Sequence, residues 1–489
     1  MKQTIWNQFS VAAAQVPQKT AIICDGISVQ YGQLFDVCAK YCSYFCANGL
    51  AAGMHVGLWV EKSIDFVAAL FALFRAGAVA VPLNTSATTD MIDASVSAAD
   101  LKWIVYGKRM AAKAAELSPR KQLRLISLSD AAQMDTVCAE AEAYCENALF
   151  LMTSGSTGNP KVAVISQDAM LYRLELEQRH FALSSDDCVL VSTPIYHSLG
   201  IRFIMTALTR GMTVVLPKAF QAEQWLHLIQ DNHVTYTITV PSQIVEILEV
   251  TKDKQSVARQ MLRSVRVILS TSAYLPQKVK QNFLSLISGQ FYNFIASSET
   301  EFMAIANCRW NDPEGDLLGE AFPSVDLQII RAGKPVTQGE VGEIVCRSRQ
   351  LFSAYYGDSE LTRRAFWEDY YRTGDLGFFD NSGRLHYAGR KKNTIICSGV
   401  NIYPRDIEQA VSQIKQVTEC AAFGLPHPKC GEILAIAVAG QDLTQEAIIR
   451  FCLHKLAPYQ QPRKIILLKE LPKNEIGKVD IRQLKNDYS

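Results

Sequence analysis

The 489-residue chain has almost no net charge and no long uninterrupted apolar run. It carries 49 lysines and arginines against 48 aspartates and glutamates, so there is no excess of positive charge to attract nucleic acid. Its most apolar stretch, residues 66–83, is interrupted by Arg75 and Gly77. The pattern predicts a buried helix, Asp65–Arg75, followed by a strand, Ala78–Pro82, and no membrane span.

Cysteine pairs with metal-binding spacing are also missing, although the chain has 13 cysteines. Cys38, Cys42 and Cys46 recur at every fourth position and would share one helix face, where we predict small buried apolar side chains. An odd number of scattered thiols indicates a reducing compartment. Residues 1–18 lack the apolar core of a signal peptide, so a cytoplasmic protein is expected.

Apolar runs of strand length alternate with segments of helical period over most of the chain. This alternation predicts an α/β fold of layered sheets with parallel strands, and the length suits two or three domains. The loop after the buried strand expected at Val265–Ser270 should open at a carboxyl edge, where ligands gather. Other expected strands are His55–Val60, Trp103–Val105, Arg124–Ile126, Cys188–Ser192 and Thr213–Leu216, and expected helices are Ala222–Asn232, Ser242–Val250 and Gln277–Leu286.

The distribution of glycine and of short polar turns predicts the domain layout. A large N-terminal domain, residues 1–388, should include a β-rich subdomain at about residues 315–388, where such turns become frequent. Residues 393–489 have their own alternation of strands and helices, and their length suits a small α+β domain. The expected junction lies at residues 389–392.

A loop rich in hydroxyl groups and glycine follows the apolar run Asn147–Met152. Glycine lets backbone N–H groups approach a phosphate, hydroxyls add donors, and a lysine adds positive charge. The loop does not end in Gly-Lys-Ser/Thr, which disfavours a P-loop NTPase. A surface turn has a similar composition and is the alternative for the loop alone. The predicted phosphate-binding residues are Thr153, Ser154, Gly155, Ser156, Thr157, Gly158 and Lys161.

Further blocks follow this loop in a fixed order. They are Gly342–Arg347, Tyr371–Leu376, Gly389–Lys392 with Ser398–Pro404, and Leu471–Lys478. Together with the loop, these blocks resemble the adenylate-forming superfamily of acyl- and aryl-CoA ligases, adenylation domains and firefly luciferase. Residues 63–84 resemble the same family, so the resemblance covers most of the chain.

The resemblance implies an enzyme with two half-reactions. A carboxylate attacks the α-phosphate of ATP to give an acyl-adenylate and pyrophosphate, and a thiol then attacks to give a thioester and AMP. The first step brings two anions together, so the site needs cations and Mg²⁺. By resemblance, Lys478 is the catalytic cation, Arg390 binds ribose or phosphate oxygens, Asp375 accepts the ribose hydroxyls, Glu299 holds Mg²⁺ and Ser298 contacts the AMP phosphate.

The region that resembles the adenine site departs from the family pattern. Ile295 stands where an aromatic residue usually covers adenine, and Ala296 replaces a glycine. An aliphatic side chain can still pack on adenine. The segment Ser270–Pro276 resembles a wall that is normally glycine-rich. Further predicted nucleotide contacts are Ser272, Ala273 and Ser297.

The block Pro194–Gly200 resembles the Pro-x-x-His-x-x-Gly block of fatty- and aryl-acid ligases, which implies a catalytic position for His197 between acid and nucleotide. No acidic residue between Thr193 and Arg210 could hold an α-amino group, so an amino acid substrate is not expected. Arg202 could pair with a second substrate carboxylate, but a solvated or structural ion pair is the stronger expectation. Predicted acid-pocket residues are Tyr196, His197, Ser198, Ile201, Ser270, Ser272, Phe294, Ile295 and Ser297.

The family hinge corresponds to Lys392, which implies that the C-terminal domain is mobile and turns between the half-reactions. Ser398, Gly399 and Val400 would then line a tunnel for the thiol. No carrier domain follows the lysine loop before Ser489, so we expect the thiol of coenzyme A, or the phosphopantetheine of a separate acyl carrier protein.

The preferred function is ATP-dependent activation of a small carboxylic acid, aryl or short-to-medium acyl, with transfer to coenzyme A. A stand-alone adenylation enzyme that loads a carrier protein is the alternative. A non-catalytic nucleotide-binding protein is disfavoured because the key charged residues, Lys161, Glu299, Asp375, Arg390 and Lys478, are all present. Luciferase-type oxygenation has no separate sequence motif here.

Overall fold

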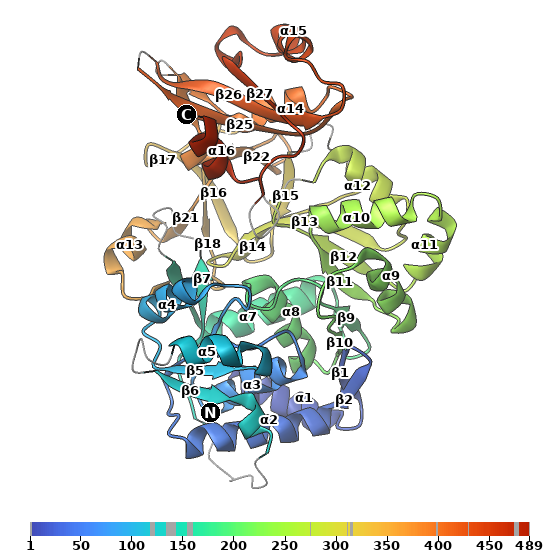
Figure 1. Ribbon diagram of the computed structural model, residues 1–489, viewed down its shortest axis with the longest axis vertical. Coiled ribbons are helices and arrows are strands. Elements are labelled where there is room, and N and C mark those ends of the chain that lie inside the picture. Colours follow the sequence, from blue (N-terminus) through green and yellow to red (C-terminus); the bar gives the residue numbers. More distant parts are fainter. Residues whose placement is uncertain are drawn as a thin grey trace.

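The computed structural model of the protein describes residues 2–117, 123–133, 143–153, 160–273, 275–310, 312, 316–397, 400–428, 430–473 and 479–488. Within these ranges the chain forms three β-sheets of 15, seven and five strands. The five-stranded sheet and its helices lie at one end of the molecule, drawn at the top of Figure 1. The α/β layers expected from the sequence are confirmed.

The seven-stranded sheet has a parallel centre and an antiparallel edge. Its spatial order is β19-β8-β7-β4-β3-β5-β6. Its strands are β3 (His55–Trp59), β4 (Val79–Pro82), β5 (Trp103–Tyr106), β6 (Arg124–Ser127), β7 (Asn147–Thr153), β8 (Lys161–Ser166) and β19 (Ala354–Tyr355). The helices of this part of the chain are α2 (Tyr31–Ala47), α3 (Ile64–Arg75), α4 (Thr89–Ala98), η1 (Lys108–Met110), α5 (Ala111–Leu117) and α6 (Leu128–Ala131).

The largest sheet changes character along its width. From β1 through β10, β9, β11 and β12 to β13 it is parallel, and from β13 to β17 it is antiparallel. Its parallel part consists of β1 (Thr20–Cys24), β9 (Cys188–Leu190), β10 (Thr213–Val215), β11 (Tyr236–Thr239), β12 (Val267–Ser270) and β13 (Gln290–Ser297), and β2 (Ile27–Gln30) joins its edge. The antiparallel part consists of β14 (Glu301–Asn307), β15 (Leu317–Ala321), β16 (Asp326–Arg331), β17 (Lys334–Pro335), β18 (Gly342–Arg347), β20 (Phe366–Trp367), β21 (Tyr370–Phe379) and β22 (Leu385–Arg390).

Helices connect most of the parallel strands of this sheet, because parallel neighbours need a crossover connection. Figure 1 shows α9 to α12 grouped on one side of the molecule. The strands and helices expected between residues 188 and 286 are confirmed, with ends shifted by at most two residues. The helices of this part and the remaining N-terminal ones are α1 (Ile5–Gln15), α7 (Gln167–His180), α8 (Ser198–Thr209), α9 (Ala222–Asp231), α10 (Pro241–Thr251), α11 (Gln255–Met261), α12 (Gln277–Leu284) and α13 (Ser359–Arg364).

The five-stranded sheet is covered by helices on both faces. Successive residues of its central strand β26 (Gly431–Gly440) enter two different cores, because side chains alternate across a strand. One core includes residues of α14 and α15, and the other includes Leu484 of α16. The remaining elements are η2 (Lys391–Asn393), β23 (Ile395–Cys397), β24 (Val400–Ile402), α14 (Pro404–Val411), β25 (Val417–His427), α15 (Gln445–Lys455), η3 (Pro458–Gln460), β27 (Lys464–Leu468) and α16 (Ile481–Tyr488).

The main core lies between the two larger sheets. It combines strand residues of both sheets with residues of α1, α2, α3, α7 and α8. Helix α3 is buried from Phe66 to Phe74, which explains why its sequence is apolar on every face. The expected helix and strand in this stretch are thus confirmed. Because α7 and α8 lie in the same core, any charged side chain on their inner faces must find a partner there.

The cysteines within the described ranges are free thiols; on α2, Cys38 and Cys42 are buried as expected, whereas Cys46 is only partly buried. Within those ranges, no helix combines the length and apolar character that crossing a membrane requires.

Candidate active site

The glycine- and hydroxyl-rich loop connects two antiparallel strands. Thr153 ends β7 and Lys161 begins β8, and the two residues are register partners. The hairpin therefore fixes both ends of the loop. The predicted phosphate-binding residues between them, Ser154, Gly155, Ser156, Thr157 and Gly158, lie outside the described residues.

Tyr355 lies between the lysine at the end of this loop and the predicted metal ligand. The Lys161 Nζ lies 5.4 Å from the centroid of the Tyr355 ring. The Tyr355 hydroxyl donates to Glu299 Oε1 at 2.9 Å and lies 3.2 Å from the Tyr371 hydroxyl. Burial and the charge of Glu299 raise the pKa of Tyr355, so its hydroxyl keeps its proton and remains a donor. One side chain thus places a cation and a carboxylate close together.

The main chain at Glu299 is held from two sides. Phe352 N donates to the Glu299 carbonyl at 2.8 Å. Arg173 Nη2 donates to the carbonyls of Ser298 and Glu299, each at 3.3 Å. Glu299 is 8% exposed, and one of its carboxylate oxygens accepts from Tyr355. A single anchored carboxylate fits Mg²⁺, which takes one or two carboxylates together with phosphate oxygens.

The predicted ribose ligands face each other across a β-hairpin. Asp375 on β21 and Arg390 on β22 are register partners, and Arg390 Nε lies 2.7 Å from Asp375 Oδ1. Asp375 N donates to Thr373 Oγ1 at 3.0 Å, past Gly374, which has a φ of 72° within β21. The Arg390 side chain is 43% exposed, whereas that of Asp375 is 5% exposed. The pair is therefore open to solvent on the arginine side.

The predicted hinge follows directly on two anchored residues. Arg390 pairs with Asp375, and Lys391 Nζ donates to Glu343 Oε2 at 2.9 Å. Lys392 lies in η2. Burial and the positive charges of Arg390, Arg482 and Lys161 lower the pKa of Lys392. Arg482 belongs to α16, so the C-terminal helix supplies one of the positive charges that act on Lys392.

The wall predicted under the adenine carries an unusual backbone. Ser272 is exposed and has a φ of 78°, a left-handed conformation that favours glycine. Thr271 Oγ1 donates to the Phe294 carbonyl at 2.8 Å and ties this wall to β13. The register between β13 and β14 shifts between Ile295 and Ala296. The two residues that depart from the family pattern, Ile295 and Ala296, therefore lie at an irregularity of the strand.

Gly200 explains why the block Pro194–Gly200 needs its glycine. A Cβ at Gly200 would lie 2.3 Å from the Pro194 carbonyl oxygen, so the start of α8 packs directly against that carbonyl. His197 is the N-cap residue of α8, and its ring centroid lies 4.5 Å from that of Tyr196. The glycine thereby fixes the path of the chain through the predicted acid pocket.

The other predicted acid-pocket residues differ in burial. Ile201 and Phe294 belong to the main core, and Ser198 is also buried. Ser270 ends β12 at the carboxyl edge of the parallel strands, and no hydrogen-bond partner of its hydroxyl is found among the described residues. Ile295 and Ser297 are partly buried. The place of all these side chains in the acid pocket stays a prediction.

Arg202 does not face a substrate. It is fully buried and paired with Glu177 and with Glu301, whose Oε1 lies 2.7 Å from Arg202 Nε. Burial alone would lower the pKa of Arg202, but the two carboxylates raise it. The structural ion pair expected from the sequence is thus confirmed, with partners that the sequence did not indicate.

Lys62 supports the segment that enters the acid pocket, and sequence reasoning missed it. Its Nζ donates to the carbonyls of Val191 and Thr193 at 2.5 and 3.1 Å, directly before Pro194. Burial lowers the pKa of Lys62 to about 7. Arg173, Glu301 and Tyr355 were missed as well; no local motif marks them, because their partners are far away in the sequence.

Several predicted residues cannot be placed. Lys478, Ser398 and Gly399 lie outside the described residues, and of Val400 only the backbone is described, in β24. Thr153, Ala273, Ala296 and Ser298 are described and lie at the ends of the elements named above or in adjacent loops.

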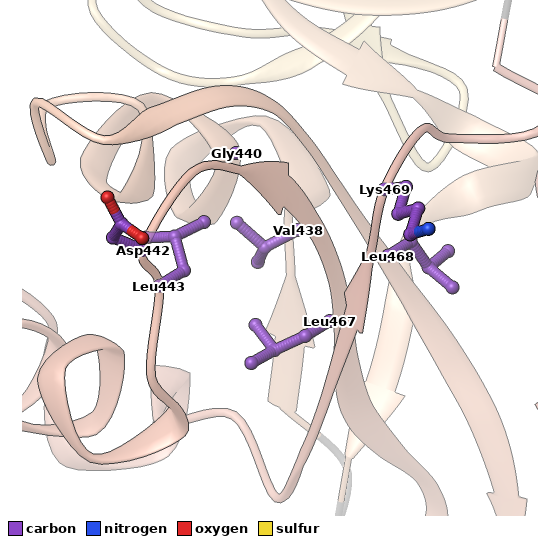
Figure 2. A pocket seen from close by; sticks show the side chains of 7 residues that line it. All are labelled: Val438, Gly440, Asp442, Leu443, Leu467, Leu468 and Lys469. Carbon is purple, nitrogen blue, oxygen red and sulfur yellow. The ribbon is translucent and has the colours of Figure 1, made fainter.

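A cavity of about 290 Å³ lies elsewhere, in the five-stranded sheet. Figure 2 shows Val438, Leu443 and Leu467 turned toward one another in it, with Asp442 and Lys469 at its sides. A second cavity, of about 370 Å³, is lined by residues of β16, β17 and β21 and by the loops beside them. Neither is lined by a predicted site residue.

Comparison with known proteins assigns the chain to a family. The family described as AMP-binding enzyme matches residues 9–356, and the AMP-binding enzyme C-terminal domain matches residues 406–478. Indoleacetate–CoA ligase of Aromatoleum aromaticum is 29% identical over 96% of this chain and 95% of its own length. 2-Succinylbenzoate–CoA ligase of Bacillus cereus is 24% identical over 99% of both.

Solved structures share the fold over the whole length. ATP-bound MatB from Rhodopseudomonas palustris superposes with a TM-score of 0.89 at 24% identity and covers 99% of both chains. The resemblance inferred from the sequence blocks is therefore confirmed. The chain belongs to the AMP-binding enzyme family and is an adenylate-forming enzyme of the acid–thiol ligase type.

Proposed function

We propose that the protein activates an aryl or short-to-medium acyl carboxylic acid with ATP and transfers it, through an acyl-adenylate, to the thiol of coenzyme A. The observation that carries this proposal is the position of Tyr355, with Lys161 over its ring and Glu299 on its hydroxyl. A phosphate-binding cation and a metal-binding carboxylate are what an ATP-cleaving site needs side by side. The named relatives, two acid–CoA ligases, support the reaction class.

In the adenylation half-reaction, each predicted site residue has a separate role in binding ATP, Mg²⁺ or the acid. Lys161 binds phosphate oxygens, and Glu299 holds Mg²⁺, which neutralises phosphate charge when bound. Asp375 accepts from the ribose hydroxyls, while Arg390 turns from Asp375 toward the nucleotide. In this proposal His197, the N-cap residue of α8, acts between the acid and the nucleotide. Lys478 supplies the cation for the attacking carboxylate and the α-phosphate.

The thioesterification half-reaction requires the C-terminal part to turn. We place the N-terminal domain at residues 1–388, the hinge at 389–392 and the mobile domain at 393–489. The anchoring of Arg390 and Lys391 by Asp375 and Glu343 supports Lys392 as the first residue free to change its backbone angles. After the turn, Ser398, Gly399 and Val400 would line the path of the pantetheine thiol.

The acceptor and the location of the protein complete the proposal. Coenzyme A is the proposed acceptor, and a phosphopantetheinylated carrier protein is the competing outcome. The free thiols of the described cysteines support a reducing, cytoplasmic setting.

Acid-dependent exchange of labelled pyrophosphate into ATP tests the first half-reaction. A panel of aryl, short, medium and long-chain acids should include indole-3-acetate and 2-succinylbenzoate, because relatives are named for these acids. We expect exchange with at least one aryl or short-to-medium acid, and thioester formation when coenzyme A is added. Glu299→Gln should abolish both. Absence of exchange with every acid, while ATP still binds, would refute the proposal, and thioester formation only on a carrier protein would reassign the acceptor.

A further inference from the structure

Four charged side chains form a connected network of ion pairs inside the main core. Arg173 and Glu177 come from α7, Arg202 comes from α8, and Glu301 begins β14; their side chains are 0–2% exposed. Arg202 Nε lies 2.7 Å from Glu301 Oε1, and Arg202 Nη1 pairs with Glu177 Oε2. Arg173 Nη1 donates to Glu301 Oε2 at 3.4 Å. Two positive and two negative charges therefore balance without contact with water.

Hydroxyl groups and aromatic rings complete this buried network. Tyr236 donates to Glu177 Oε1 at 2.6 Å, and Thr206 donates to Glu177 Oε2 at 2.5 Å. Ser198, at the first turn of α8, donates to Glu301 Oε2 at 2.9 Å. The Arg202 guanidinium lies 4.7 and 4.5 Å from the ring centroids of Phe203 and Phe302. Both carboxylates therefore accept hydroxyl hydrogen bonds, and the Arg202 guanidinium is enclosed by two carboxylates and two aromatic rings.

At one end of the network, Arg173 forms hydrogen bonds with the main chain that carries the proposed metal ligand, Glu299. Arg173 donates to the carbonyls of Ser298 and Glu299 and, through Nε, to the Gln350 carbonyl at 2.8 Å. The other end lies on α8, whose first residue, Ser198, follows His197. The network therefore connects the proposed metal-binding segment, Ser298–Glu299, with the proposed acid-binding segment at the start of α8.

A purely stabilising role does not account for this arrangement. Burying four charges is costly, and apolar side chains of similar size often stabilise a core as well or better. In some proteins buried charges are retained because they fix a geometry that apolar packing would leave loose. The buried ion pair of Lys280 and Asp312, 2.7 Å apart, shows the contrast, because it grips neither the Ser298–Glu299 segment nor the start of α8.

We propose that the network of Arg173, Glu177, Arg202 and Glu301 is a positioning device that fixes the Ser298–Glu299 main chain relative to the start of α8. Arg173 and Arg202 act as positioning residues: they hold the metal ligand and the acid-binding segment at the separation that in-line attack requires. A displacement of about 1 Å between reacting groups can cost on the order of 100-fold in rate. The inference rests on the proposed function, in which Glu299 binds Mg²⁺.

Replacing Arg173 by lysine tests the metal side directly. Arg173→Lys keeps the positive charge beside Glu301, but a lysine cannot reach three carbonyls and a carboxylate in the fork geometry of arginine. We expect the Kd of Mn²⁺, measured by electron paramagnetic resonance with α,β-methylene-ATP, to rise about 10–100-fold, the usual effect of losing a group that orients a metal ligand. The kcat should fall, and the acid KM should change less.

Breaking the network at Glu301 tests its link to the acid side. Glu301→Gln keeps the size of the side chain and leaves Arg202 paired with Glu177, so the chain should still fold. We expect a weaker Mn²⁺ affinity together with a raised KM for the acid that exchanges fastest. Arg202→Met should move both quantities in the same direction if it folds. Lys280→Met, which breaks a buried ion pair away from both segments, should lower the melting temperature without changing either quantity.

Two results would overturn the inference. One is a Mn²⁺ affinity and an acid KM within about twofold of wild type in Arg173→Lys and Glu301→Gln. The other is an equal change of both quantities in Lys280→Met, which would show a general effect of lost stability. Failure of the proposed function is distinguishable, because it would appear as wild-type protein that binds Mn²⁺ with the ATP analogue but exchanges no pyrophosphate with any acid.

Discussion

Two sets of opposite charges, one in the core behind the candidate active site and one within that site, differ in their access to water. In the buried network, Arg202 and Glu301 are 0% and 2% exposed, and their partners lie in the same core. In the ribose pair, Asp375 is 5% exposed but Arg390 is 43% exposed. A pair enclosed by protein cannot exchange its partner for a ligand, whereas Arg390 can swing into solvent and release Asp375. Burial thus separates charges that hold geometry from charges that bind substrate.

Removing one member of the buried network should have the largest effect on stability. Arg202→Met leaves Glu177 and Glu301 buried with Arg173 as their remaining cation, and breaking such a network typically costs about 3–5 kcal/mol. Urea denaturation followed by tryptophan fluorescence measures the loss. Arg347→Met, which breaks two ion pairs that are about half exposed, with Asp326 and with Asp369, serves as the control and should leave the denaturation midpoint close to wild type. Equal shifts in the two variants would remove the distinction by burial.

Removing Asp375, the acceptor of the ribose pair, should weaken nucleotide binding and leave the stability of the protein nearly unchanged. Asp375→Ala should weaken the binding of α,β-methylene-ATP by about 1.5–3 kcal/mol, since charge-assisted hydrogen bonds to the ribose hydroxyls are lost. The unfolding free energy should change little, because Arg390 can rehydrate where it is exposed. Isothermal titration calorimetry and denaturation on the same preparation check both parts. An unchanged Kd would show that Asp375 serves the backbone of β21 beside Gly374 and its pair with Arg390, and not the nucleotide.

The two sets of charges also differ in what the sequence could tell. Asp375 and Arg390 stand in recognisable blocks, so their roles were predicted, and the β21–β22 register only had to bring them together. Arg173 and Glu177 are spaced i, i+4 on α7, a spacing typical of an exposed helix pair. In the structure each pairs across the core instead, with Glu301 and Arg202.

Local sequence patterns predicted the helices and strands well, because these elements are determined by residues close together in the sequence. The apolar run around Phe71 predicted α3, and its bounds hold to within one residue. Tyr355 lies in a strand of only two residues and meets Glu299, 56 positions away, through the pairing of β19 with β8. Such contacts follow from the order of strands in a sheet, which neither hydrophobic period nor single blocks encode. The strained Ser272 backbone was likewise invisible in the sequence.

The open side of the site also stores backbone strain at Ser272. A non-glycine residue in the left-handed region costs roughly 1–2 kcal/mol, part of which is offset by the greater chain entropy of glycine when unfolded. Ser272→Gly should therefore raise the unfolding free energy by about 1 kcal/mol. Ser324→Gly is a matched control, since Ser324 has a φ of 65° and lies outside the predicted site. Both should stabilise, but only Ser272→Gly should change the KM for ATP. A loss of stability in Ser272→Gly would show that the serine is held by contacts stronger than the strain.

A third cluster, formed by His386, Asp316 and Asp380, is intermediate in burial. It tests whether the contribution of a charge cluster to the unfolding free energy falls as its exposure rises. His386 is 18% exposed; its Nδ1 lies 2.8 Å from Asp316 Oδ1 and its Nε2 lies 3.3 Å from Asp380 Oδ2. Its ring stacks on Phe378 with centroids 5.0 Å apart. The hydrogen bond to Asp316, and the charges of both aspartates, raise the pKa of His386 above its usual 6.5.

A raised pKa in the folded state fixes the sign of the pH dependence. The stabilisation by His386 should be fully present below about pH 6.5, the unfolded value, and should be lost as the pH rises through the raised folded value. The difference in unfolding free energy between wild type and His386→Gln should therefore be largest near pH 5.5 and shrink by about pH 8.5, and it should stay below about 1 kcal/mol, as for other partly exposed pairs. Denaturation of both proteins across this range measures it. A difference that grows with pH would mean that the folded protein favours the neutral imidazole, and that exposure does not rank these three clusters.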